Sequence, residues 1–197
     1  MTAPLVAVLD YGIGNLRSAE KALQKVGADA RLTRDPALVD DARAVVLPGV
    51  GAFGACMDAL RGAGLEDVVH SAVASGRPFL GICVGMQMLF DDSEENPGAH
   101  GLGVIPGSVR WIPVGVKRPQ MQWNRLNIVR PDPLLAGPEL VDVDGGSWVY
   151  FVHSLHGVPT DPDAVIATCE YGTTLNAIFR SEEHMSELQS RFGISYA

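Results

Sequence analysis

The sequence has few cysteines, no long apolar run and no block of basic residues, and each absence excludes a class of protein. Its three cysteines, Cys56, Cys83 and Cys169, form neither an even set for disulfides nor a CxxC zinc pattern. No apolar run approaches the roughly 20 residues of a membrane-spanning helix, and the first residues, MTAPLVAVLD, lack the basic segment of a signal peptide. We therefore expect a cytoplasmic protein that does not enter a membrane.

The charge and the histidines exclude two further classes of site. The net charge of -8 is spread along the chain, whereas binding to a phosphate backbone requires clustered Lys and Arg. The five histidines show no metal-ligand spacing. We therefore expect neither a nucleic-acid partner nor a metal. Cys56 and Cys169 are interpreted as small buried hydrophobic residues.

The composition favours one globular domain with an α/β fold. The 197 residues include 47% hydrophobic residues, 22 glycines and 13 prolines, which suits a single turn-rich domain. Short apolar runs alternate with helix-like stretches, which predicts a central, mostly parallel sheet covered by helices. The expected strands are Leu5–Leu9, Ala44–Leu47 and Pro78–Ile82, and the expected helices include Leu16–Val26 and Leu65–Ala74.

After Asp91 the pattern changes. Short strands spaced by Gly and Pro are expected around Gly103–Ile112, Trp123–Val129 and Trp148–Val152, which predicts a mixed or antiparallel extension of the sheet. Neither an internal repeat nor a low-complexity linker divides the chain. We expect one domain over residues 1–179.

A cysteine lies in a pattern typical of a nucleophile at a sharp turn. The segment Pro78–Gln87 reads as a buried strand that passes directly into a helix through Gly-x-Cys-x-Gly. Gly81 and Gly85 would permit the tight turn, and a helix beginning at Val84 would favour the Cys83 thiolate. The alternative is an ordinary tight loop in which Cys83 only fills space.

A second glycine-rich segment, Pro48–Gly54, follows the predicted strand Ala44–Leu47. A parallel sheet would place it next to the turn at Cys83. Its backbone N–H groups are unobstructed by side chains, which suits the stabilisation of an oxyanion. Taken alone, this Gly-x-Gly pattern indicates only a turn.

The combination of PGVGAFG, GICVGMQ, DYGIGN and FVHS resembles class I glutamine amidotransferases of the triad type. Within that class, Asp10–Asn15, Gly85–Phe90 with the following Ser93–Glu95, and the MxWN segment at Met121–Asn124 resemble the glutaminase subunit of imidazole glycerol phosphate synthase, from the histidine pathway. The resemblance covers about residues 5–179. It implies a three-layer α/β fold and a glutaminase that uses no cofactor.

The resemblance implies specific roles for residues of the two glycine-rich segments. Cys83 would attack the side-chain amide of glutamine, release ammonia and leave a thioester that water hydrolyses. The N–H of Val84, with one from Val50 or Gly51, would form the oxyanion hole, and the PGVG segment is expected to reorient before this hole is complete. The implied substrate-binding residues are Gly49, Gln87, Glu95 and Ser154; without the resemblance, Gln87 and Glu95 would be interpreted as surface polar residues.

The resemblance also implies a partner. In this family the ammonia passes into a (β/α)₈ cyclase subunit, which combines it with a phosphoribulosyl carboxamide nucleotide to form imidazole glycerol phosphate and an aminoimidazole carboxamide ribotide. Asn15, Trp123 and Asn124 match the docking face for this subunit. The alternative for Trp123 is a partly buried core aromatic.

The sequence departs from the family pattern at three places. Leu155 replaces a tyrosine that contacts the substrate, and Gln122 replaces a glycine of the docking segment. The family's Q-F-H-P-E-K-S motif, which supplies the triad His and Glu, is absent, and residues 180–190 resemble a translated sequencing-adapter read. We expect residues 180–197 to be a non-native tail and the native C-terminus to be missing.

Three alternatives remain open at this point. His184 lacks the family's preceding strand, and Glu182 and Glu187 lack the His-x-Glu spacing, so the chain as given is expected to be inactive unless His184, His153 or His156 acts as the base. The chain would then be a docking module rather than an enzyme. A third possibility is another class I amidotransferase, such as the glutaminase subunit of pyridoxal phosphate synthase, which DYGIGN and the MxWN segment disfavour.

Overall fold

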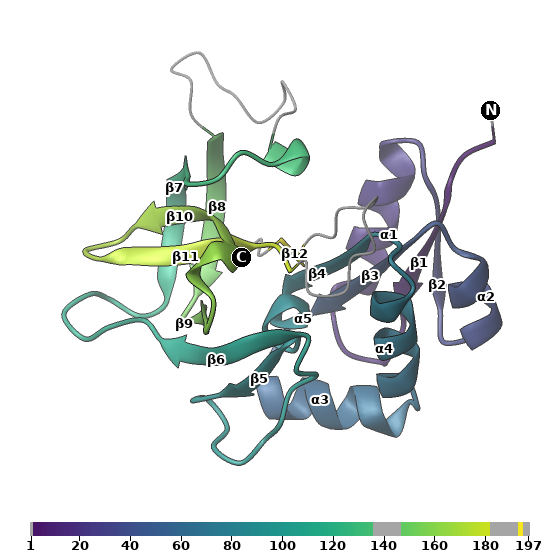
Figure 1. The fold of residues 1–197 in the computed structure, drawn as a ribbon, viewed down its shortest axis with the longest axis horizontal. Helices are drawn as coiled ribbons and strands as arrows, with labels where there is room; N and C mark the ends of the chain where they lie inside the picture. Colours follow the sequence, from purple (N-terminus) through teal and green to yellow (C-terminus); the bar gives the residue numbers. More distant parts are fainter. Residues whose placement is uncertain (1, 136–146, 182–192, 195–197) are drawn as a thin grey trace.

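The structure is a computed structural model that describes residues 2–135, 147–181 and the backbone of 193–194. Its nine-stranded sheet has the order β2-β1-β3-β4-β12-β11-β10-β7-β8, and a separate three-stranded sheet has the order β5-β6-β9. Figure 1 shows the helices gathered around the first four strands and the remaining strands forming the other half of the molecule. His184, Glu182 and Glu187 lie outside the described residues.

The first half of the chain alternates strands and helices around parallel strands. Strand β1 pairs in parallel with both β2 and β3, and β3 pairs in parallel with β4. The elements are β1 (Leu5–Leu9), α1 (Leu16–Lys25), β2 (Asp29–Thr33), α2 (Pro36–Asp41), β3 (Ala44–Gly49), α3 (Phe53–Gly62), α4 (Glu66–Ala74) and β4 (Phe79–Cys83).

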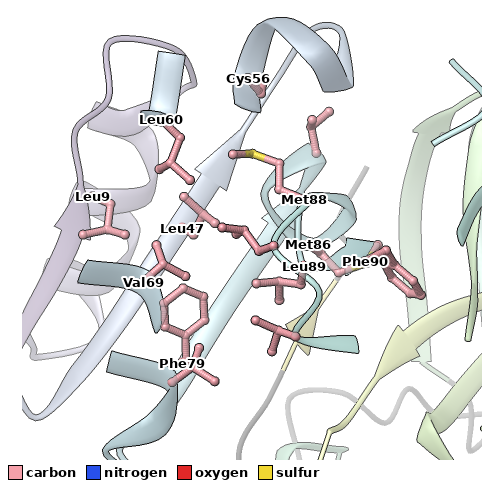
Figure 2. Packing of buried hydrophobic residues seen from close by; sticks show 14 of the residues in the cluster. Leu9, Leu47, Cys56, Leu60, Val69, Phe79, Met86, Met88, Leu89 and Phe90 are labelled. Atoms are coloured by element: carbon pink, nitrogen blue, oxygen red, sulfur yellow. The ribbon is translucent and has the colours of Figure 1, made fainter. Parts of the chain in front are cut away.

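Strands β1 and β3 are buried on both faces because helices cover each side of the sheet. Val6, Val8 and Val46 form a cluster with side chains of α1. The alternate residues, including Leu9 and Leu47, join α2, α3 and α4 in the larger core. Figure 2 shows side chains of this larger core converging from strands and helices. This two-sided burial is the expected consequence of the continuous apolar runs in parallel strands.

A short helix and a small sheet follow the central strand. Helix α5 (Val84–Gln87) leads into β5 (Phe90–Ser93), which pairs in parallel with β6 (Ile105–Trp111). Strand β9 (Leu155–Pro159) pairs antiparallel with the other edge of β6. Phe90 joins this sheet to the main one, since its ring packs edge-to-face on Phe179 with centroids 5.3 Å apart.

The rest of the large sheet is antiparallel. It contains β7 (Gln120–Ile128), β8 (Ser147–His153), β10 (Val165–Glu170) and β11 (Thr174–Phe179), with short 3₁₀ turns at Pro133–Leu135 and Pro162–Ala164. The two-residue strand β12 (Gly193–Ile194) joins the halves, because it pairs antiparallel with β11 and in parallel with β4 at Ile82. In the part of the chain that the structure describes, no helix is long and apolar enough to cross a membrane.

The predicted α/β fold with a mixed extension is confirmed. The predicted strands and helices occur with ends shifted by only a few residues. The domain boundary at residue 179 stays a prediction.

Candidate active site around Cys83

Cys83 ends the central strand β4 and immediately precedes helix α5. Its φ of 55° and ψ of -119° make it the one non-glycine residue with positive φ in the described part of the chain. Such a conformation costs about 1–3 kcal/mol and persists only where the surroundings impose it. The predicted turn is therefore present, and Cys83 lies at the carboxyl end of β4, where the neighbouring parallel strand β3 also ends.

Close packing of backbone segments explains the two glycines that flank Cys83. A Cβ on Gly81 would lie 2.6 Å from Met86 Cα, and one on Gly85 would collide with the carbonyl of Leu47. Since these neighbours are backbone atoms, they cannot move aside as a flexible side chain would. The glycines let α5 pack directly on β3 and β4.

The PGVG segment lies beside the cysteine, as the sequence predicts. Gly49 pairs with Cys83 in the parallel register of β3 and β4. Two side chains hold this segment: the Tyr11 hydroxyl donates to the Pro48 carbonyl (2.6 Å), and the Cys56 thiol donates to the Val50 carbonyl (3.3 Å).

Burial, rather than the helix, dominates the protonation of Cys83. Burial raises the pKa of its thiol above the ordinary value, and the hydrogen bond with the Val84 backbone lowers it by less. The Val84 N–H at the helix end favours the thiolate, as expected, but burial outweighs it, so the expected net lowering of the Cys83 pKa is wrong. The physical reason is that burial removes more hydration from the charged sulfur than the single Val84 N–H replaces.

The other two cysteines are buried, as predicted, with side chains fully inaccessible to solvent. Burial raises the pKa of Cys56, and it raises the pKa of Cys169 to about 11. Cys83 is partly accessible. Access therefore distinguishes Cys83 from Cys56 and Cys169.

The predicted substrate residues lie on different elements. Gln87 ends α5 and is 6% exposed, with its Nε2 3.5 Å from the Leu155 carbonyl. Ser154 is half-buried between β8 and β9. Leu155, which stands where the family has a tyrosine, is buried and contributes this backbone acceptor.

Glu95 makes a contact that the sequence did not indicate. Its Oε2 accepts a hydrogen bond from the backbone N–H of Phe53 (2.7 Å), the first residue of α3. The neighbouring Asn96 accepts from the N–H of Gly54 (2.9 Å). Glu95 is thus joined to the helix that follows the PGVG segment, while remaining half-exposed.

The two histidines of strands β8 and β9 both have lowered pKa values. His153 has Nδ1 2.8 Å from the Leu155 carbonyl and Nε2 2.9 Å from Gln120 Oε1, and burial lowers its pKa. Burial is also the main reason that the pKa of His156 falls to about 4. In the described part of the chain, no histidine is hydrogen-bonded to Cys83.

The three predicted docking residues have unlike surroundings. Asn15 is exposed at the start of α1, and its side chain does not cap that helix. Trp123 on β7 is 63% exposed, so its alternative interpretation as a core aromatic is wrong. The side-chain amide of Asn124 is hydrogen-bonded within its own chain: it donates to the Glu170 carbonyl (2.7 Å) and accepts from the Arg125 backbone N–H (2.8 Å).

Trp123 belongs to an exposed apolar strip. The strip lies on one face of the β7–β8 pair and consists of Met121, Trp123, Trp148, Tyr150 and Val152. Trp123 packs edge-to-face on Tyr150 with ring centroids 5.6 Å apart. An apolar strip of this kind on a sheet face is typical of a protein-binding surface. Gln122, the departure from the family pattern, is exposed on the same strand.

The sequence did not identify Tyr11, Asn96 or Tyr150. Tyr11 stood inside the DYGIGN motif, and Asn96 directly follows Glu95, so nearness to a motif was an available signal. The cross-strand pairing of Trp123 with Tyr150 depends on the strand register. No local pattern reports that register.

A cavity of about 410 Å³ lies away from Cys83, lined by Ile105, Arg130, Asp163 and Arg180 among others. None of the predicted site residues lines it. Among the described residues, no group of three or more His, Cys, Asp or Glu side chains is arranged to hold a metal ion.

Comparisons with known proteins agree on one family. The family described as glutamine amidotransferase class-I matches residues 7–189. The chain is 47% identical over 180 residues to the imidazole glycerol phosphate synthase subunit HisH of Syntrophotalea carbinolica, covering 88% of this chain and 85% of that protein. It is 46% identical over 178 residues to the HisH subunit of Methanothermobacter thermautotrophicus, covering 90% and 85%.

Solved structures share the fold. A crystal structure of a glutamine amidotransferase matches with a TM-score of 0.69 at 21% identity, covering 96% of this chain and 87% of that one. The structure of PurLQS from Thermotoga maritima matches with a TM-score of 0.68 at 20% identity, covering 98% and 86%.

Proposed function

The chain belongs to the class-I glutamine amidotransferases and, within them, to the family of imidazole glycerol phosphate synthase subunit HisH, and we propose that its Cys83 site hydrolyses glutamine to glutamate and ammonia for histidine biosynthesis. The observation that carries this proposal is the position of Cys83 in a strained turn opposite Gly49. The alternative of a pyridoxal phosphate synthase subunit receives no support from these relatives.

The chemistry begins with the thiol. Cys83 Sγ loses its proton and attacks the carbon of the glutamine side-chain amide, and the carbonyl oxygen becomes an oxyanion. The amide nitrogen then takes a proton and leaves as ammonia. The resulting thioester is hydrolysed by water, which returns the thiol and releases glutamate.

Backbone N–H groups hold the oxyanion in this proposal. The N–H of Val84 follows the nucleophile directly, and the Val50–Gly51 backbone follows Gly49, the residue paired with Cys83. Removing one oxyanion donor commonly costs about 10²–10³-fold in rate. Gly49, Gln87, Glu95 and Ser154 are proposed to hold the glutamine around these groups.

A cyclase subunit is the proposed recipient of the ammonia. The exposed strip around Trp123 and Tyr150 supports a docking role, because exposed aromatic residues are enriched in binding hot spots. Asn15, which immediately precedes α1, remains a proposed contact. For Asn124 we propose an indirect role, since its amide already fixes β7 to the Glu170 carbonyl.

We also propose that the chain as given turns over glutamine poorly. The sequence contains no Q-F-H-P-E-K-S segment, and His153 and His156 have lowered pKa values and no hydrogen bond to Cys83. General acid–base catalysis contributes roughly 10²–10⁴-fold in rate. A chain without it would act mainly as a docking module.

Glutamate release, measured with the cyclase subunit and its nucleotide substrate present, tests the proposed function. We expect a slow release that Cys83→Ala removes and that Cys169→Ala, at a buried cysteine on β10, leaves unchanged. Equal release from the wild-type and Cys83→Ala chains would refute the assignment of the nucleophile.

A further inference from the structure

Only three residues separate Gly49, the end of β3, from Phe53, the start of α3, so the position of the helix constrains where the Val50–Gly51 backbone lies. Its N-cap residue is Ala52, whose methyl side chain forms no cap hydrogen bond. The first N–H groups of a helix have no partner within the helix and require an acceptor from elsewhere. The structure supplies these acceptors from a distant part of the sequence.

The acceptors come from the segment that follows β5. Glu95 Oε2 accepts from Phe53 N–H at 2.7 Å, and Asn96 Oδ1 accepts from Gly54 N–H at 2.9 Å. Each pair is separated by 42 residues in the sequence. Two distant side chains therefore perform the task that an N-cap side chain usually performs.

This segment is itself held in place. Ser93 is 3% exposed, and its hydroxyl accepts from Glu95 N–H at 3.2 Å. The Ser93 carbonyl accepts from Asn96 N–H at 3.3 Å, and the Asn96 carbonyl accepts from Ala99 N–H at 3.0 Å. Asn96 is thus a fixed acceptor rather than a loosely held surface side chain.

The packing at Gly54 supports a close fit. A Cβ at this position would lie 3.1 Å from Asn96 Cγ, within the range where a neighbour must move. Any side chain at position 54 would push against the Asn96 amide. The absence of a side chain there lets the amide reach the helix backbone.

We propose that Asn96, together with Glu95, positions the oxyanion segment Val50–Gly51 by capping α3, so that Asn96 acts on the rate of attack by Cys83 and not on glutamine binding. This inference rests on the proposed function. Asn96 is a positioning residue, because its amide contacts the helix and not the reacting atoms. Glu95 joins the same cap to the proposed glutamine site.

The test uses a chloroketone analogue of glutamine, whose carbonyl takes the place of the reacting amide, and measures saturable modification of Cys83 as kinact and KI. We expect Asn96→Ala to lower kinact about tenfold with KI unchanged, because a small displacement of a catalytic group can cost up to about 10²-fold in rate. Asn96→Asp keeps the acceptor and should react within about twofold of the wild type. Iodoacetamide, which forms no oxyanion, should alkylate Cys83 equally fast in all variants.

A second substitution, which gives α3 a cap of its own, should restore the rate that Asn96→Ala loses. Ala52 is exposed and has extended backbone angles, which suit a serine that caps its own helix. Ala52→Ser in the Asn96→Ala chain should restore kinact to within about twofold of the wild type.

Three results would overturn the inference: an unchanged kinact in Asn96→Ala, no recovery in the folded double variant, or loss of the near-UV circular dichroism of both variants. A wild-type chain that the chloroketone does not modify saturably would reject the glutamine site itself, and this inference with it.

Discussion

Gly49 lies directly beside Cys83 in the parallel register of β3 and β4, which brings the proposed oxyanion segment Val50–Gly51 and the proposed nucleophile together at the carboxyl ends of these strands. A Cβ at position 49 would lie 2.9 Å from the Val84 carbonyl carbon and would also collide with Gly85 N. The relationship between the two residues therefore depends on the absence of a side chain.

Gly49→Ala should destabilise the protein by about 1–3 kcal/mol, the usual cost of adding a methyl group where no space exists. The atoms it would meet are backbone atoms and cannot adjust by rotation. Urea unfolding measures the change in free energy. Gly62→Ala is the matched control: its Cβ would meet nothing within 4 Å, and Ala in a helix gains up to about 1 kcal/mol over Gly. Equal effects of the two changes would disprove the packing argument.

Trp123→Ala should weaken binding of the cyclase subunit by about 30-fold or more, as expected for an aromatic hot spot worth about 2 kcal/mol. The thermal midpoint should change little, because Trp123 is 63% exposed. Isothermal titration calorimetry measures the affinity. Val26→Ala, at an 81% exposed residue that follows α1, is the control and should bind like the wild type. Unchanged binding by Trp123→Ala would place the docking surface elsewhere.

The acid stability of the protein should depend on His156. Its pKa falls from an ordinary 6.5 to about 4 in the folded chain, mainly through burial. The unfolded chain therefore binds a proton more readily between these values, so this contribution to stability is complete above about pH 6.5 and is lost as the pH falls towards 4. His156→Gln should flatten the unfolding free energy over that range. His70→Gln, at an exposed histidine, should follow the wild-type curve; identical curves for all three proteins would contradict the burial argument.

The local features of the site were predictable, and the distant contacts were not. The turn at Cys83 follows from glycines at fixed spacing around one residue, and the PGVG segment follows from the end of a neighbouring strand. The cap that Glu95 places on Phe53 joins residues 42 positions apart, and the hydrogen bond from Asn124 to the Glu170 carbonyl spans 46. The raised pKa of Cys83 also needed the structure, since burial depends on all the elements packed around it.

A chimera tests the acid–base proposal. Replacing the residues after Phe179 with a family ending that contains Q-F-H-P-E-K-S should raise glutamate release by about 10²–10⁴-fold over the chain as given, the range that general acid–base catalysis supplies. Both proteins are assayed with the cyclase subunit and its nucleotide substrate. Equal rates would mean that His153, His156 or His184 already serves as the base.

The identity of the reactive cysteine tests the central claim most directly. The chain is treated briefly with the chloroketone analogue of glutamine, and the modified residue is located by peptide mass mapping. We expect the adduct on Cys83, because it is the one partly accessible cysteine of the three, and we expect excess glutamine to slow its formation. An adduct on Cys56 or Cys169, or labelling of Cys83 that glutamine does not slow, would contradict a glutamine site at this turn.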